Sequence, residues 1–241
     1  MPKHFFFDLD NTLTPSKSPI EEAHVPTLKQ LAQRADVIVV SGHGEADIRS
    51  HLTEALHGCF YTLGQNGNRA VTYDGKVLWN NSLTQGQREA TLAFIAKARA
   101  LLNYVVRDEN DIIEDRDSQI AFSLIGHHED KAKKDSFDPR HEIRFKLLRD
   151  LAPDVEALKI ANVEVRIGGT TNLDFFEYGK NKGYNVNLFI EKMSWRKEDC
   201  IYIGDALFPG GNDETVVGVI ETHAVKDHRE TYEYLSSVLP S

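Results

Sequence analysis

Short apolar runs alternate with helical patterns along the first third of the chain. Residues 5–7 and 37–40 are continuously apolar, as in strands of a parallel sheet that is covered on both faces. Between them, Val25, Leu28 and Leu31 recur at helical spacing, and Pro26 places the start of that helix near residue 25. A second helix is expected over residues 45–56. Strand, helix, strand and helix in this order predict a parallel α/β sheet.

The middle of the chain has a different pattern. A hairpin at residues 71–73 and 77–79 is followed by a helical pattern over 84–102. Strand-like runs come next, and a further helix is expected from residue 138. The expected strands are residues 104–107, 112–114, 119–125, 163–167 and 173–176. Consecutive strands with flanking helices are typical of a separate α+β domain.

The alternating pattern returns after Gly179. We expect a helix over 181–192, strands at 200–204 and 215–219, and a closing helix over 227–238. The fold class predicted is therefore α/β, with a Rossmann-like parallel-sheet core made of residues 1–83 plus 179–241. Residues 84–178 are predicted to be an inserted α+β cap.

Composition and charge narrow the possible partners. The 241 residues are 41% hydrophobic and 27% charged, as in a globular chain. The 28 Lys and Arg against 37 Asp and Glu give a net charge of −9, which argues against nucleic acid or an anionic membrane as main partner. No apolar run approaches the ~20 residues that span a bilayer, so a cytoplasmic location is expected. The ten histidines are scattered without ligand spacing, and no zinc site is predicted from them.

Two aspartates directly follow the first predicted strand. Asp8 and Asp10 stand at positions i and i+2, so they point to the same side at the carboxyl end of that strand. Ligands of open α/β sheets bind beyond these ends. Two close carboxylates repel each other unless they share a proton or a cation, and Mg²⁺ is the simplest such cation. The pair taken alone favours an ordinary acidic strand end.

Other strand ends carry matching chemistry. Ser41 and Gly42 lead into a helix N-terminus, where backbone N–H groups favour an anion. Asp205 follows the strand at 200–204, and Asp213 comes one loop later. Lys182 lies at the start of a helix, although a helix start favours anions. Their order at strand-to-helix junctions favours one assembled site over unrelated polar residues.

These motifs resemble those of the haloacid dehalogenase superfamily of phosphotransferases. The resemblance rests on the run Phe-Asp-Leu-Asp-Asn-Thr-Leu-Thr at residues 7–14, with Ser41, Lys182 and Gly204-Asp205. Residues 203–213, Ile-Gly-Asp-Ala-Leu-Phe-Pro-Gly-Gly-Asn-Asp, are similar to a specific segment of the eukaryotic-type phosphomannomutases. Capped sugar-phosphate phosphatases stand beside those mutases in the superfamily.

The resemblance implies a mechanism and a set of residue roles. Asp8 would be the nucleophile that forms an aspartyl-phosphate, and Asp10 would be the general acid and base. It also implies that Mg²⁺ is held by Asp8, the backbone carbonyl of Asp10, Asp205 and Asp213, and that the phosphate is met by Lys182, Thr12, Ser41 and Gly42.

Residues of the predicted cap bear on whether the reaction is hydrolysis or a mutase reaction. Arg116 stands where the mutases hold the distal phosphate with arginine, but His127 and Lys17 replace other arginines, and Asn172 replaces a serine. Asp174 matches a family landmark. Because His and Lys lack the planar fork of Arg, these exchanges favour hydrolysis of a sugar phosphate over a hexose-phosphate mutase. A catalytically silent sugar-phosphate sensor is the alternative from another class, and a homodimer through the cap stays open.

Overall fold

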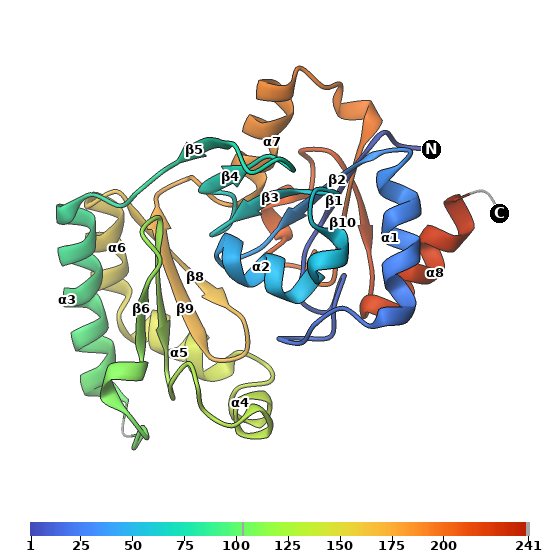
Figure 1. Ribbon diagram of the computed structural model, residues 1–241. Helices are drawn as coiled ribbons and strands as arrows, with labels where there is room; N and C mark the ends of the chain where they lie inside the picture. The colour runs from blue at the N-terminus through green and yellow to red at the C-terminus, as the bar shows by residue number, and fades with distance from the viewer. Residues whose placement is uncertain (103, 240–241) are drawn as a thin grey trace. The chain divides into compact units, whose positions relative to one another are not determined.

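A computed structural model describes residues 1–102 and 104–239 (Figure 1). The chain folds into two compact units. The core unit consists of Met1–Asn81 and Lys180–Ser241, and the inserted unit is Ser82–Gly179.

The core unit is built on a seven-stranded sheet of order β11-β10-β1-β2-β3-β4-β5. The first five of these strands are parallel, whereas β4 and β5 add an antiparallel extension. The predicted parallel α/β class is therefore confirmed. The strands are β1 (His4–Phe7), β2 (Asp36–Val40), β3 (Tyr61–Gly64), β4 (Arg69–Val71), β5 (Val77–Asn80), β10 (Cys200–Gly204) and β11 (Glu221–Ala224).

Successive side chains of the central strands point to opposite faces of the sheet and pack into two apolar clusters. Phe5 and Phe7 enter a cluster on the face that α1, α2 and α8 cover, whereas Phe6 packs with residues of α7 on the other face. Figure 1 shows α1 and α8 side by side at the same side of the sheet. The helices are α1 (Val25–Ala32), α2 (Glu45–Leu52), α7 (Lys182–Met193) and α8 (His228–Val238), with short 3-10 turns η1 (Glu22–His24), η2 (Glu54–Leu56), η4 (Lys197–Asp199) and η5 (Glu214–Val216).

The inserted unit is an antiparallel sheet of order β6-β7-β9-β8 with helices on one face. α3 and α6 cover the face that carries Ile120, Phe122, Leu173 and Phe175, and these residues form one apolar cluster. Its elements are α3 (Gln85–Leu101), η3 (Glu109–Asp111), β6 (Ile113–Asp115), β7 (Gln119–Ser123), α4 (Lys131–Phe137), α5 (Glu142–Asp150), α6 (Ala152–Ile160), β8 (Val163–Gly168) and β9 (Asn172–Glu177).

Several predicted elements are wrong in detail. Residues 104–107 form no strand, the helix expected from residue 138 begins at Glu142, and α4 was not predicted. The predicted strand at 215–219 is replaced by η5, and the strand of this region is β11. β11 has the polar sequence Glu-Thr-His-Ala because it is an edge strand with little apolar burial, so hydrophobicity did not reveal it.

One buried asparagine holds both points where the chain passes between the units. The backbone carbonyl of Asn68 accepts a hydrogen bond from the Asn81 N–H at 2.8 Å. The side-chain amide of Asn68 donates to the backbone carbonyl of Lys180 at 2.9 Å. Asn185 in α7 donates to the same Lys180 carbonyl at 3.1 Å. The last residue before the insertion and the first one after it are thus fixed to the core unit.

Candidate active site

Pairing register brings three loops to one edge of the core sheet. Phe7 is paired with Ile203 on one side and with Val39 on the other. Asp8, Gly204 and the residues after Val40 therefore leave the sheet at the same carboxyl edge, where α/β folds bind ligands.

Lys182 joins two buried aspartates at this edge. Its Nζ donates to Asp8 Oδ1 at 2.6 Å and to Asp213 Oδ1 at 2.7 Å, and its side chain is only 1% exposed. Tyr202 also donates its hydroxyl to Asp213, at 2.6 Å. The first residue of α7 is thus held in place by carboxylates that come from two different strand-end loops.

Three carboxylates here form an acidic group that fits a divalent cation. One oxygen each from Asp8, Asp205 and Asp213 lies within 4.8 Å of the others. Burial, with the neighbouring Asp213, raises the pKa of Asp205 to about 6, and burial raises the pKa of Asp8 well above its usual value despite the ammonium of Lys182. Three carboxylates and one ammonium leave two negative charges, which a divalent, oxygen-seeking ion such as Mg²⁺ would neutralise.

Asp10 is engaged away from this acidic group. His43 Nε2 lies 2.9 Å from Asp10 Oδ2, and the backbone N–H of Lys17 donates to Asp10 Oδ1 at 2.6 Å. Although burial opposes it, the hydrogen bond from His43 and the N–H of Lys17 lower the pKa of Asp10 to about 2. The side chain of Lys17 is exposed, so this residue contributes through its backbone here.

The residues predicted to meet phosphate lie in the neighbouring loops. Ser41 is buried directly after β2, and its hydroxyl accepts the His43 N–H at 3.1 Å. Gly42 follows it in the turn toward α2. Thr12 is fully buried in the loop after Asp8, and its Oγ1 has no hydrogen-bond partner within the described residues. A buried hydroxyl without a partner is uncommon in folded proteins.

The face of the inserted sheet opposite α3 and α6 carries residues predicted to bind substrate. Residues paired across antiparallel strands share a face, and Ala121 is paired with both Glu114 and Asp174. The carboxylate of Glu114 lies 2.5 Å from Arg116 Nη2 and 3.7 Å from His127 Nδ1. The structure thus brings Arg116 and His127 together around one glutamate, on the face that α3 and α6 leave uncovered.

Asn172 and Asp174 stand two positions apart on β9, on this same face. The buried side chain of Arg144 lies at the start of this strand. It is 0% exposed and pairs with Asp138 at 2.8 Å. Arg144 Nη1 also donates to the carbonyls of Gly168 and Asn172, at 2.9 and 3.2 Å. A buried guanidinium therefore fixes the turn that presents Asn172.

Sequence reasoning missed several residues of this arrangement. His43 contacts Asp10, Asn11 donates to Asp205 at 3.3 Å, and Tyr202 binds Asp213. The signal for Tyr202 was available, because a tyrosine inside an otherwise apolar strand needs a partner for its hydroxyl. Arg144 carried no such signal, since its partner Asp138 and its carbonyl acceptors lie in separate turns.

This chain belongs to the haloacid dehalogenase-like hydrolases, whose family model matches residues 5–213. It is an enzyme of the phosphotransferase superfamily that its motifs resemble. Its relatives include phosphomannomutases: it is 26% identical to the one from Oryza sativa subsp. japonica, over 98% of this chain and 95% of the relative. It is also 26% identical to human phosphomannomutase 1, over 94% of this chain and 88% of the relative.

Solved structures share the fold. SMU.1108c from Streptococcus mutans aligns over 100% of both chains with a TM-score of 0.72 and 15% identity. Plasmodium falciparum IMP-nucleotidase aligns over 99% of this chain and 62% of its own, with a TM-score of 0.71 and 15% identity. Identities this low carry the fold alone.

Among the described residues, none of the helices combines the length and the apolar character needed to cross a bilayer.

Proposed function

We propose that this protein hydrolyses the phosphate ester of a small phosphorylated sugar with Mg²⁺, through an aspartyl-phosphate on Asp8. The observation that carries the proposal is the buried contact of Asp8 with Lys182 beside Asp205 and Asp213. It combines a carboxylate nucleophile, a fixed cation and a group of oxygens suited to Mg²⁺.

The first half of the reaction uses Asp8 and Asp10. An oxygen of Asp8 attacks phosphorus, the bond from phosphorus to the sugar oxygen breaks, and that oxygen takes a proton from Asp10. Because its lowered pKa leaves Asp10 ionised near neutral pH, that proton first reaches Asp10 through its hydrogen bond with His43, at 2.9 Å. Lys182 and the Ser41 loop stabilise the negative charge on the phosphoryl oxygens. Bound at Asp8, Asp205 and Asp213, Mg²⁺ would supply further neutralisation of that charge.

The second half returns Asp8 to its free form. A water molecule gives a proton to Asp10 and attacks phosphorus, and the bond between phosphorus and the Asp8 oxygen breaks to release inorganic phosphate. The lowered pKa of Asp10 suits this step, because a carboxylate is the form that accepts a proton.

An Asp8→Asn variant tests the nucleophile. We expect no turnover of p-nitrophenyl phosphate and no acid-stable phosphoprotein after a quench with labelled substrate, with an unchanged far-UV circular dichroism spectrum. Asp199→Asn, a change at the core surface where Asp199 pairs with Lys3, serves as control and should keep full activity. Turnover retained in Asp8→Asn would rule out the covalent route.

A hexose-phosphate mutase is the second candidate, and the phosphomannomutase relatives favour it. The two reactions differ in the fate of the phosphoryl group, which passes to water or to a second sugar hydroxyl. Incubation with Mg²⁺, mannose 1-phosphate and a trace of hexose 1,6-bisphosphate separates them. Inorganic phosphate alone supports hydrolysis, whereas mannose 6-phosphate supports the mutase.

Arg116→Ala tests whether the face of the inserted sheet opposite α3 and α6 recognises the sugar phosphate. We expect a raised KM or lost turnover for sugar phosphates with p-nitrophenyl phosphate turnover unchanged, because the aryl ester has no sugar for Arg116 to recognise. Arg140→Ala is the matched control, since that exposed arginine of the same unit pairs only at the surface with Glu142. An equal loss on both substrates would contradict this role.

A further inference from the structure

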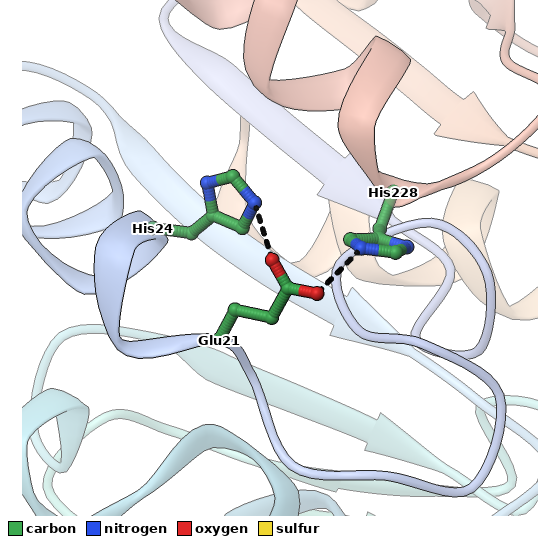
Figure 2. A group of neighbouring side chains, drawn as sticks. All are labelled: Glu21, His24 and His228. Atoms are coloured by element: carbon green, nitrogen blue, oxygen red, sulfur yellow. Dashed lines mark hydrogen bonds and ion pairs between the residues drawn. The ribbon is translucent and has the colours of Figure 1, made fainter.

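Two histidines and a glutamate from distant parts of the chain meet in the core unit, outside the candidate active site. Glu21 precedes η1, His24 ends it immediately before α1, and His228 is the first residue of α8. One donor atom from each lies within 4.8 Å of the others (Figure 2). Sequence spacing could not reveal this group, because Glu21 and His228 are 207 positions apart.

The distances within this group suit ligands around a metal ion. His24 Nε2 lies 3.4 Å from Glu21 Oε2, and His228 Nε2 lies 3.3 Å from Glu21 Oε1. Both exceed the 2.7–3.2 Å typical of N–H···O hydrogen bonds. Two donors that are each about 2.05 Å from a tetrahedral ion lie roughly 3.3 Å apart. Each of the two N···O separations therefore equals one edge of such a tetrahedron, and each ends on a different oxygen of the Glu21 carboxylate.

The histidine rings are held in place by the core. The His24 ring stacks on Tyr232 at 3.8 Å with an interplanar angle of 5°, and the Tyr232 hydroxyl donates to the carbonyl of Leu13 at 2.9 Å. His24 Nε2 is buried and makes no hydrogen bond of normal geometry with any described residue. Figure 2 shows this nitrogen directed at the carboxylate of Glu21, with the His228 ring on the carboxylate's other side. A buried ring nitrogen thus faces the acid from a fixed position.

We propose that Glu21, His24 and His228 bind a divalent transition-metal ion of the zinc class, which ties the start of α1 to the start of α8. Two imidazoles with one carboxylate suit Zn²⁺, whereas the all-carboxylate group of the active site suits Mg²⁺. The Glu21 side chain is 52% exposed and those of His24 and His228 are 20% and 12% exposed, so water reaches the fourth position from the glutamate side. The ion acts as a tether, independent of the proposed reaction.

Metal stoichiometry of the full chain tests this site. The protein is dialysed against Zn²⁺ or Co²⁺ in excess Mg²⁺, which keeps the aspartate group occupied, and bound metal is measured by elemental analysis. We expect one Zn²⁺ per chain, visible absorption bands of tetrahedral Co²⁺, and shifted ¹⁵N resonances of two histidine rings.

Matched variants separate the site from unspecific binding. His24→Gln/His228→Gln should lose the metal and the rise in Tm caused by Zn²⁺, whereas His223→Gln should keep both. His223 is a suitable control because its ring also stacks on a tyrosine of α8, Tyr234, at 4.1 Å. Glu21→Gln, at a largely exposed side chain, should keep the fold and weaken Zn²⁺ binding at least about tenfold. Folded wild-type protein that retains no Zn²⁺, or equal retention in Glu21→Gln, would overturn the proposal.

Discussion

Replacing Lys182 by methionine removes one buried positive charge and leaves a side chain of similar length. Each of its contacts, at 2.6 Å to Asp8 and 2.7 Å to Asp213, is worth roughly 6 kcal/mol of attraction at an effective dielectric constant of about 20. Desolvation of the charges offsets much of this attraction. Loss of one partner from such a buried group still costs about 3–5 kcal/mol, because the other partners stay charged and buried.

The stability of Lys182→Met is measured by urea and thermal unfolding beside Lys192→Met, an exposed change on the same helix. We expect a Tm lower by roughly 6–20 °C, at about 2–4 °C per kcal/mol for a unit of this size. Lys192→Met should stay within about 0.5 kcal/mol of wild type. Turnover of p-nitrophenyl phosphate should fall at least about 100-fold in Lys182→Met, because the phosphoryl oxygens lose a fixed positive charge.

The pH dependence decides whether charge is the cause. Burial already raises the pKa of Asp8 and of Asp205, and loss of the ammonium raises both further. The folded variant then binds more protons than the unfolded chain at mildly acidic pH, so its deficit in unfolding free energy should shrink from pH 8 to pH 5. A deficit below 1 kcal/mol at pH 8, or one that grows at pH 5, would refute the reasoning.

Three other predictions concern different parts of the molecule. Arg144→Met should destabilise the inserted unit by about 3–5 kcal/mol, because it leaves the buried Asp138 unpaired; hydrogen exchange should show this loss, and Arg144→Met/Asp138→Asn should recover part of it. Gly183→Ala should cost about 1–3 kcal/mol in urea unfolding, since its Cβ would lie 1.9 Å from a backbone oxygen, whereas Gly86→Ala, with open space around it, should stabilise by about 0.5–1 kcal/mol; equal effects would contradict the packing argument. Burial raises the pKa of Asp205 to about 6, so the stability that its protonated form contributes is present below pH 4 and is lost as pH rises through 6. Because Mg²⁺ binds the ionised carboxylate, it should raise Tm more at pH 7 than at pH 5. A rise in Tm independent of pH would count against metal binding by this group.

The parallel core was predictable because its strands are apolar on both faces. Residues 5–7, 37–40 and 200–204 are continuous apolar runs, and the structure places all three side by side. The edge strand β11 was not predictable in this way, because one neighbour and partial exposure allow a polar sequence there. The valines at 216, 217 and 219 misled the prediction, since Val216 is buried in the turn η5 rather than in a strand.

The strand-end aspartates were predictable because their position follows from chain order and strand register. The side-chain contacts of these aspartates were not predictable, since His43 contacts Asp10 and Lys182 contacts Asp213 from separate loops. The pairing of His24 with His228 depends in the same way on how α1 packs against α8. Side-chain meetings of this kind need the tertiary structure.

The double attachment at Asn68 makes the inserted unit replaceable in principle. Because the amide of Asn81 and the carbonyl of Lys180 are both fastened to one residue, the core presents two anchored chain ends at a set position. Lys182 begins its helix just beyond the second anchor, so a change of length or sequence between residues 82 and 179 need not displace it. On the proposed division of roles, in which the inserted unit recognises the substrate, residues 82–179 can therefore change while the acidic group and Lys182 of the core unit stay in place.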